Sequence, residues 1–310
     1  MSMFLGFDTS NYTTSAALFD SGTMTVRQQK KLLPVPAGAR GLRQSECVFH
    51  HTVQLPALVD ALGGDCGPID AVCASDRPRM QEGSYMPCFL VGAGAAQITA
   101  KALGVPFYST SHQHGHIAAA AFGAGKLDLL HESFYAFHVS GGTTEAVLVQ
   151  PDKDEIFSCT LVAQSLDLKA GQAIDRTGVM LGLQFPCGAA LETLAAQSDR
   201  SFRIRPTLKD GCPSLSGIEN RCKKMLDAGE PPADIAKFCL ESVTISLEKM
   251  TEALLEKEPL PLLYAGGVMS NTMIRERFTK RFGAFFAPPA LSADNAAGTA
   301  IIGFLKHERE

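Results

Sequence analysis

The stretch SHQHGH at residues 111–116 holds three of the eight histidines of the chain. Residues four positions apart lie on one face of an α-helix, so His112 and His116 could share one metal ion. Two histidines and one distant carboxylate form a common open site for Fe or Zn, and Asp294 in SADN is a candidate third ligand. The same residues also fit surface or core histidines and, for Asp294 at the predicted start of the last helix, a helix cap.

Two polar turns, Asp8-Thr9-Ser10 and the SGGTT stretch at 140–144, each join two short apolar strands. Backbone N–H groups and hydroxyls at such turns can hold a phosphate, although ordinary hairpin turns have the same composition. A third turn, Gly266-Gly267, lies between an apolar strand and a helix predicted to begin near Ser270. Glycines there let a ligand approach the backbone, and the helix N-terminus favours an anion or a base edge.

Two carboxylates, Asp175 and Glu192, lie on consecutive predicted helices that are joined by a turn at Pro186-Cys187-Gly188. Both could accept hydrogen bonds from the hydroxyls of a ribose. Carboxylates on helices are usually solvated surface charges, so the two interpretations stay open.

Each half of the chain opens with the same unit, an apolar strand, a polar turn and a second strand. The patterns predict these strands at 3–7 and 15–19 in the first half and at 134–139 and 146–149 in the second. Apolar periodicity predicts helices at 53–62, 89–103, 112–122, 169–182, 189–198, 214–228, 234–256, 270–282 and 293–305. This alternation indicates a duplicated α/β architecture with the ligand between the halves.

Length and composition exclude several classes of protein. The 310 residues allow about two domains, and a net charge of −4 excludes a surface that is basic overall. No apolar run is long enough for a membrane span, and the start of the chain predicts no signal peptide. Nine cysteines without a CxxC pair predict reduced thiols in a cytoplasmic protein, with neither a disulfide framework nor a structural zinc site.

Seven motifs occur here in the order found in the TsaD (Gcp) family, once called O-sialoglycoprotein endopeptidase. They are LGFDTSNYTTSAAL, SHQHGH, HVSGGTTEAVLV, AGQAIDRTGVMLGLQFPCGAALETLA, SLSGIEN, YAGGVMSN and SADNAAGTA. The resemblance extends from about residue 3 to residue 303. It implies a duplicated actin-like (sugar kinase/Hsp70-type) ATPase fold with a ligand cleft between two lobes. We expect the lobes at 1–125 and 126–292, with a final helix at 293–310 that packs back on the first lobe.

The resemblance also implies an activity and the residues that serve it. The reaction is transfer of a threonylcarbamoyl or related carbamoyl group from an acyl-adenylate to N6 of adenosine 37 in tRNA. The matching metal ligands are His112, His116 and Asp294, and no further catalytic residue is implied because the amine attacks without a covalent enzyme intermediate. The matching adenylate contacts are Val139, Ser140, Gly141, Gly142, Asp175, Gly188, Glu192 and Asn271.

The implied cofactors are one divalent ion, Fe or Zn, and an adenine nucleotide: threonylcarbamoyl-AMP, ATP or AMP. The implied partners are tRNA, bound within a complex, and TsaB-like and TsaE-like proteins or a second copy of the chain. Three clusters of cations are candidates for tRNA contact, and each also fits an ordinary solvated face. These clusters are Arg40 with Arg43; Arg203, Arg205 and Lys209; and Arg275, Arg277, Lys280 and Arg281.

Several positions depart from the family pattern. His114 replaces a glutamate between the metal histidines, Leu168 replaces the second acid of an Asp-Asp pair, and Glu219 replaces a basic residue. Metal and nucleotide contacts are thus kept while flanking acids are lost, as in a divergent paralogue. The alternatives are a non-catalytic nucleotide-binding scaffold, a carbamoyl or phosphoryl transferase acting on a small molecule, and a metallopeptidase. The last lacks the HExxH glutamate, because Gln113 follows His112.

Overall fold

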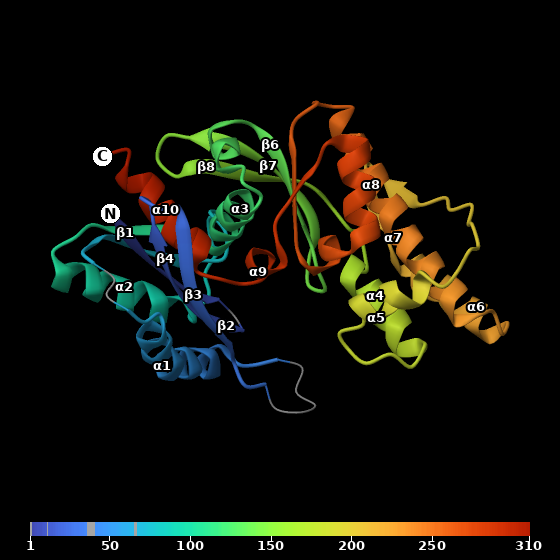
Figure 1. Ribbon diagram of the computed structural model, residues 1–310, viewed down its shortest axis with the longest axis horizontal. Coiled ribbons are helices and arrows are strands. Elements are labelled where there is room, and N and C mark those ends of the chain that lie inside the picture. The colour runs from blue at the N-terminus through green and yellow to red at the C-terminus, as the bar shows by residue number, and fades with distance from the viewer. Residues whose placement is uncertain (1, 11, 36–40, 65–66) are drawn as a thin grey trace. The chain divides into compact units, whose positions relative to one another are not determined.

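The computed structural model describes residues 2–10, 12–35, 41–64 and 67–310. The chain forms two compact units, and most of their helices and strands are labelled in Figure 1. Unit 1 comprises Met1–Glu132, Gln150–Cys159 and Ala290–Glu310, and unit 2 comprises Ser133–Val149 and Thr160–Pro289. In the described part of the chain, no helix is long and apolar enough to cross a membrane.

A five-stranded sheet with the order β3-β2-β1-β4-β5 forms the centre of unit 1. Its strands are β1 (Met3–Ser10), β2 (Thr13–Asp20), β3 (Thr25–Leu32), β4 (Ile69–Arg77) and β5 (Phe107–Ser111). The first three strands form an antiparallel meander, whereas β4 runs parallel to β1 and β5 runs parallel to β4. Every residue of β1 is buried, because helices cover both faces of the sheet.

The helices of unit 1 are α1 (Gln44–Ala61), α2 (Phe89–Leu103), α3 (His112–Gly123), η1 (Leu127–His131) and α10 (Ala297–His307), and the short α9 (Pro289–Ser292) leads into it. Two glycines let α10 approach its neighbours closely. A Cβ at Gly6 would lie 2.5 Å from the backbone N of Ala300, and a Cβ at Gly298 would lie 1.8 Å from the backbone O of Gly115. The second contact sets α10 directly against α3, which carries the histidine cluster.

A second five-stranded sheet, in the order β12-β11-β6-β7-β8, forms the centre of unit 2. Its strands are β6 (Phe134–Val139), β7 (Thr144–Asp152), β8 (Ile156–Gln164), β11 (Leu262–Ala265) and β12 (Phe285–Phe286). The strand β6 pairs antiparallel with β7 and parallel with β11, which pairs parallel with β12. This is the pairing pattern of the first sheet, so the predicted duplication is confirmed.

The helices of unit 2 are α4 (Ala170–Met180), α5 (Gly188–Ala195), α6 (Ser216–Asp227), α7 (Pro232–Leu255), η2 (Gly267–Ser270) and α8 (Thr272–Phe282). A small hairpin pairs β9 (Thr207–Lys209) with β10 (Cys212–Ser214). The core lies between the sheet and α7, where the Tyr264 ring stacks on Phe137 at 4.5 Å. This packing holds the ends of β6 and β11, from which the glycine turns emerge.

Three predicted elements differ from the structure. The residues Asp8, Thr9 and Ser10 lie within β1 rather than in a turn. The helix predicted at 53–62 begins at Gln44, where Glu46 Oε2 accepts a 2.8 Å hydrogen bond from the backbone N of Arg43. Its first two turns mix exposed, half-buried and buried residues and give little periodic apolar signal. The last helix begins at Ala297, because the Asn295 side chain accepts from the backbone N of that residue at 3.0 Å.

Candidate metal centre and nucleotide pocket

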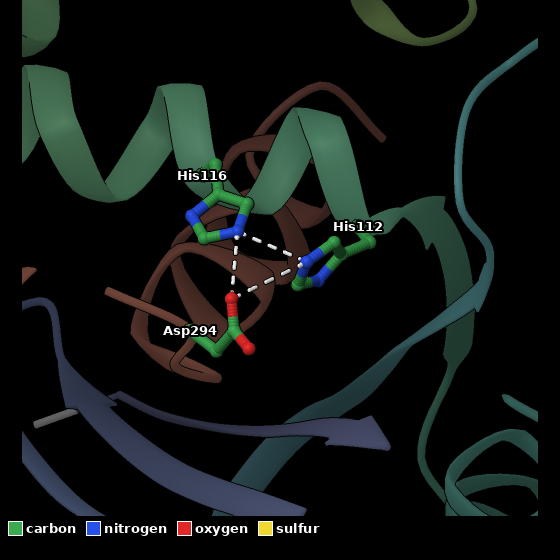
Figure 2. Close-up of side chains that lie close together, drawn as sticks. All are labelled: His112, His116 and Asp294. Atoms are coloured by element: carbon green, nitrogen blue, oxygen red, sulfur yellow. Dashed lines mark hydrogen bonds and ion pairs between the residues drawn. The ribbon is translucent and has the colours of Figure 1, made fainter. Parts of the chain in front are cut away.

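The three predicted metal ligands lie together in unit 1 (Figure 2). Ser111 caps α3 by accepting a hydrogen bond from the backbone N of His114, and the helix then presents His112 and His116 on one face. Their Nε2 atoms are 2.9 Å apart. The Oδ1 atom of Asp294 lies 3.3 Å from Nε2 of His116 and 3.7 Å from Nε2 of His112.

Asp294 reaches this position from the segment between α9 and α10. It is therefore not the cap of the last helix, whose N-cap residue is Ala296. Its Oδ2 atom accepts a 3.0 Å hydrogen bond from Thr13 Oγ1, which leaves Oδ1 directed at the histidines. Burial alone would raise the pKa of Asp294, but His116, His112 and Thr13 outweigh it and hold that pKa well below its usual range.

A buried acid behind the cluster orients His112. The Asp8 side chain is 1% exposed, and its carboxylate accepts hydrogen bonds from His112 Nδ1 at 2.8 Å, from the Ser10 backbone N at 3.0 Å and from the Ser75 hydroxyl. The pKa of Asp8 is lowered although burial opposes this, because His112 and Ser75 stabilise the ionised form. An ionised carboxylate only accepts hydrogen bonds, so His112 carries a proton on Nδ1, and Nε2 is the ring atom left to face a cation.

The chemistry of these donors fits one ion. Imidazole nitrogen and carboxylate oxygen suit Fe and Zn. Donors that bind one such ion at about 2.0–2.2 Å lie roughly 3.0–3.5 Å from one another. The three observed separations span 2.9 to 3.7 Å, so the site needs little rearrangement to receive a cation and leaves coordination positions open.

Unit 2 contains an open pocket of about 710 Å³. It is lined by Gly141, Gln172, Asp175, Arg176, Val179, Met180, Phe185 and Glu219. Two of these, Gly141 and Asp175, were predicted as adenylate contacts. The Phe185 side chain is 73% exposed and Val179 is 57% exposed, so the pocket presents apolar surface beside its charged groups.

The predicted phosphate loop is held against the helix that carries Asp175. The Ser140 hydroxyl accepts from the backbone N atoms of Gly142 and Thr143, at 3.3 and 3.1 Å. The backbone N of Gly171 donates to the Ser140 carbonyl at 3.1 Å. A Cβ at Gly171 would lie 2.5 Å from the backbone N of Gly141, so only glycine permits this contact between α4 and the loop.

The remaining predicted adenylate residues lie at a helix start, within α5, at a strand end and at the cap of α8. Glu192 Oε1 accepts from the Thr272 backbone N at 2.8 Å, and Asn271 caps α8 through Ile274. Gly188 begins α5, and Val139 is the buried end of β6. Among the described residues, these four do not line the 710 Å³ pocket.

Comparison with known proteins decides the family. A family model described as TsaD, tRNA N6-adenosine threonylcarbamoyltransferase, matches residues 39–301. The chain belongs to the TsaD family. A tRNA N6-adenosine threonylcarbamoyltransferase of Thermus thermophilus is 30% identical over 314 residues, which cover 98% of this chain and 93% of the relative.

Solved structures of other proteins share the fold. Component A of the (R)-2-hydroxyglutaryl-CoA dehydratase of Acidaminococcus fermentans has a TM-score of 0.56 at 14% identity and covers 99% of this chain and 100% of its own. A ROK family glucokinase of Streptomyces griseus has a TM-score of 0.50 at 14% identity, with 99% of both chains covered. The predicted actin-like, sugar-kinase-type fold is confirmed.

One departure from the TsaD pattern has a clear structural role. His114, which stands where the family has glutamate, points away from the metal ligands into the unit. Its Nε2 donates to the Phe157 carbonyl at 2.7 Å, its Nδ1 accepts from the Ser111 hydroxyl at 2.7 Å, and the ring stacks on Phe157 at 4.6 Å. Burial lowers the pKa of His114 and keeps it neutral. The residue thus anchors the first turn of α3.

Asp8 was not predicted as the partner of His112. Further residues of these sites that were not predicted as members are Thr13 and Ser75 at the metal centre and Gln172, Arg176, Val179, Met180, Phe185 and Glu219 in the pocket wall. The available signal for Asp8 was its charge, because it directly follows the apolar strand predicted at 3–7. The large apolar Phe185 in the turn before Pro186 was a signal for the pocket. Ser75 and Arg176 carry no local signal, because only tertiary contacts define their roles.

Proposed function

We propose that this chain transfers a threonylcarbamoyl or related carbamoyl group from an acyl-adenylate to N6 of adenosine 37 in tRNA. The observation that carries the proposal is the convergence of His112, His116 and Asp294 at distances suited to one ion, in a chain that the TsaD family model matches over 39–301. A cytoplasmic location accords with the described cysteines, all of which are free thiols.

In the proposed metal site, three residues bind the ion and two others orient these ligands. His112, His116 and Asp294 would hold an Fe or Zn ion, which supplies a Lewis acid that polarises a carbonyl and stabilises developing negative charge. Asp8 keeps the lone pair of His112 directed at the ion, and Thr13 does the same for Oδ1 of Asp294.

The proposed nucleotide site is the pocket of unit 2. Its volume of about 710 Å³ lies within the usual range for small-molecule sites. Phe185 and Val179 offer apolar contact to the adenine, Asp175 lies within reach of the ribose, and the backbone of Gly141 and Gly142 offers donors to the phosphate. Glu192 and Asn271 contribute by fixing the start of α8, and Gly188 begins α5.

We also propose that a TsaB-like protein binds the outer face of α1 and α2. Large apolar side chains are exposed there: Phe49 is 62%, Val53 60%, Leu90 56% and Ile98 73% exposed. An open groove of about 720 Å³ lies between these helices and β1. The variant Val53→Asp/Ile98→Asp should no longer co-elute with a TsaB-like protein, whereas Tyr85→Asp, at another exposed position, should. Unchanged co-elution, or a homodimer of the wild type through this face, would contradict the assignment.

Mass spectrometry of tRNA nucleosides tests the function. Cells depleted of their own TsaD enzyme should regain threonylcarbamoyladenosine when they express this chain with its partners, and not when they express Asp294→Ala. The matched control is Asp154→Ala, which removes an exposed acid of unit 1 and should behave like the wild type. Restoration by Asp294→Ala, or failure of a well-expressed wild type to restore the nucleoside, would contradict the proposal.

A further inference from the structure

The three cation clusters that are candidates for tRNA contact have different environments in the structure. In the cluster at 275–281, Arg277 makes two 2.6 Å hydrogen bonds to the buried Glu248. Arg281 pairs with Glu248 and Glu252, and Arg275 lies over the ring of Phe286. Arg277 and Arg281 therefore hold α8 on α7, and Arg275 packs on β12. In the first cluster, Arg40 lies outside the described residues.

The cluster of Arg203, Arg205 and Lys209 has a different environment. Burial alternates from Ser201 to Lys209: Phe202, Ile204, Pro206 and Leu208 are half-buried, and the residues between them are exposed. The β9–β10 pairing continues this alternation. The three cations therefore share one outward face, in a stretch that contains no acid. Within the described ranges, none of the three forms an ion pair with a carboxylate.

The spacing of these cations suits a polyanion. Residues two apart in an extended chain are separated by about 6.6 Å, and residues four apart by about 13 Å. A row of cations with such a separation can follow successive phosphates of one strand, and such contacts position a nucleic acid without reading its sequence.

The same segment is tied to the wall of the nucleotide pocket. The hydroxyls of Ser214 and Ser216 and the backbone N of Leu215 donate to Asp167, just before α4. The α6 helix that follows carries Glu219, which pairs with Arg176 of α4 at 2.9 Å. Both residues line the pocket. A nucleic acid held along residues 201–209 would therefore lie beside β10, whose last residue, Ser214, is joined to that pocket wall through Asp167.

We infer that residues 201–209, the basic arm, bind the phosphate backbone of tRNA through Arg203, Arg205 and Lys209. This inference rests on the proposed function, because it identifies the surface by which the acceptor is held. The logarithm of the tRNA binding constant falls linearly with the logarithm of the salt concentration. For each phosphate contact that is lost, the slope of this line should become less steep by about 0.7 to 0.9.

The test compares two triple variants of the full chain, each assembled with its TsaB-like and TsaE-like partners, in tRNA binding between about 50 and 200 mM salt. We expect Arg203→Ala/Arg205→Ala/Lys209→Ala to bind tRNA at least tenfold more weakly at low salt, with a slope less steep by about 2 to 3. Arg221→Ala/Lys223→Ala/Lys224→Ala removes three exposed cations of α6 and should match the wild type. Arg203→Lys/Arg205→Lys, which keeps the charge, should retain the slope.

Metal content and AMP affinity of the same preparations separate the two proposals. Both should be unchanged in the basic-arm variant, and this result also shows that the variant is folded. An unchanged tRNA affinity and slope in that variant, an equal loss in the α6 variant, or a wild type with no salt-dependent tRNA binding would overturn the inference. Absence of metal and AMP binding from the wild type would instead contradict the proposed function.

Discussion

The candidate metal centre of unit 1 and the nucleotide pocket of unit 2 are built in different ways. In the metal centre, hydrogen bonds between side chains orient the predicted ligands: Asp8 orients His112, and Thr13 orients Asp294. In the pocket, the polar groups fix the backbone: the Ser140 hydroxyl closes its own turn, and Asp175 Oδ1 accepts from the backbone N of Cys187 at 2.8 Å. The metal centre should therefore depend on the identity of individual side chains, and the pocket on the shape of its turns.

The largest effect should follow from removal of a ligand. His116→Ala leaves two donors, and we expect metal affinity to fall beyond the roughly 10–100-fold that loss of a second-layer partner causes. AMP affinity should stay unchanged. A competition titration with a metal-binding dye measures the first quantity and calorimetry the second. His131→Ala is the matched control, since it removes an exposed histidine of unit 1. Equal metal affinity in both variants would refute the ligand role.

A smaller loss should follow from Asp8→Asn. The amide cannot serve as a charged acceptor for both His112 Nδ1 and the Ser75 hydroxyl, so His112 loses its fixed tautomer. We expect metal affinity to fall by about 10–100-fold, and the visible absorption of the cobalt-loaded protein to change. Asp154→Asn should leave both unchanged. An unaltered spectrum together with wild-type affinity would show that Asp8 has only a structural role.

The pocket should respond to backbone shape. Gly171→Ala places a Cβ against the Gly141 backbone, so we expect AMP to bind roughly tenfold more weakly and the unfolding free energy to drop by about 1–3 kcal/mol. Gly217→Ala is the matched control, because a Cβ at this helical position meets no atom within 4 Å. Metal affinity should be unchanged in both. Equal AMP affinity in the two variants would contradict a pocket shaped by its turns.

The smallest effect concerns pH. Burial lowers the pKa of His51 to about 4, from the ordinary 6.5. Protonation therefore favours the unfolded chain, and His51 costs stability as pH falls from about 6.5 towards 4. In His51→Asn, whose amide can still meet Thr14, the melting temperature should fall less between pH 7 and pH 5 than in the wild type. Parallel pH profiles of the two proteins would contradict this assignment.

The sequence predicted the histidine helix and the two strand–turn–strand units, because their spacing and alternation are local. It also nominated Asp294 as a candidate third ligand, but local patterns say nothing of its distance from His116. That distance depends on the close packing of Gly298 against Gly115. Asp8 was misplaced in a turn because a buried acid in a strand is stable only when partners such as His112 and Ser75, distant in sequence, neutralise it.

The decisive measurement is a crystal structure of the purified chain with anomalous diffraction data collected at the Fe and Zn absorption edges. We expect one anomalous peak at one of these edges, about 2.0–2.2 Å from Nε2 of His112, Nε2 of His116 and an Oδ atom of Asp294. Side chains that point apart, or a metal-loaded protein whose peak lies elsewhere, would contradict it.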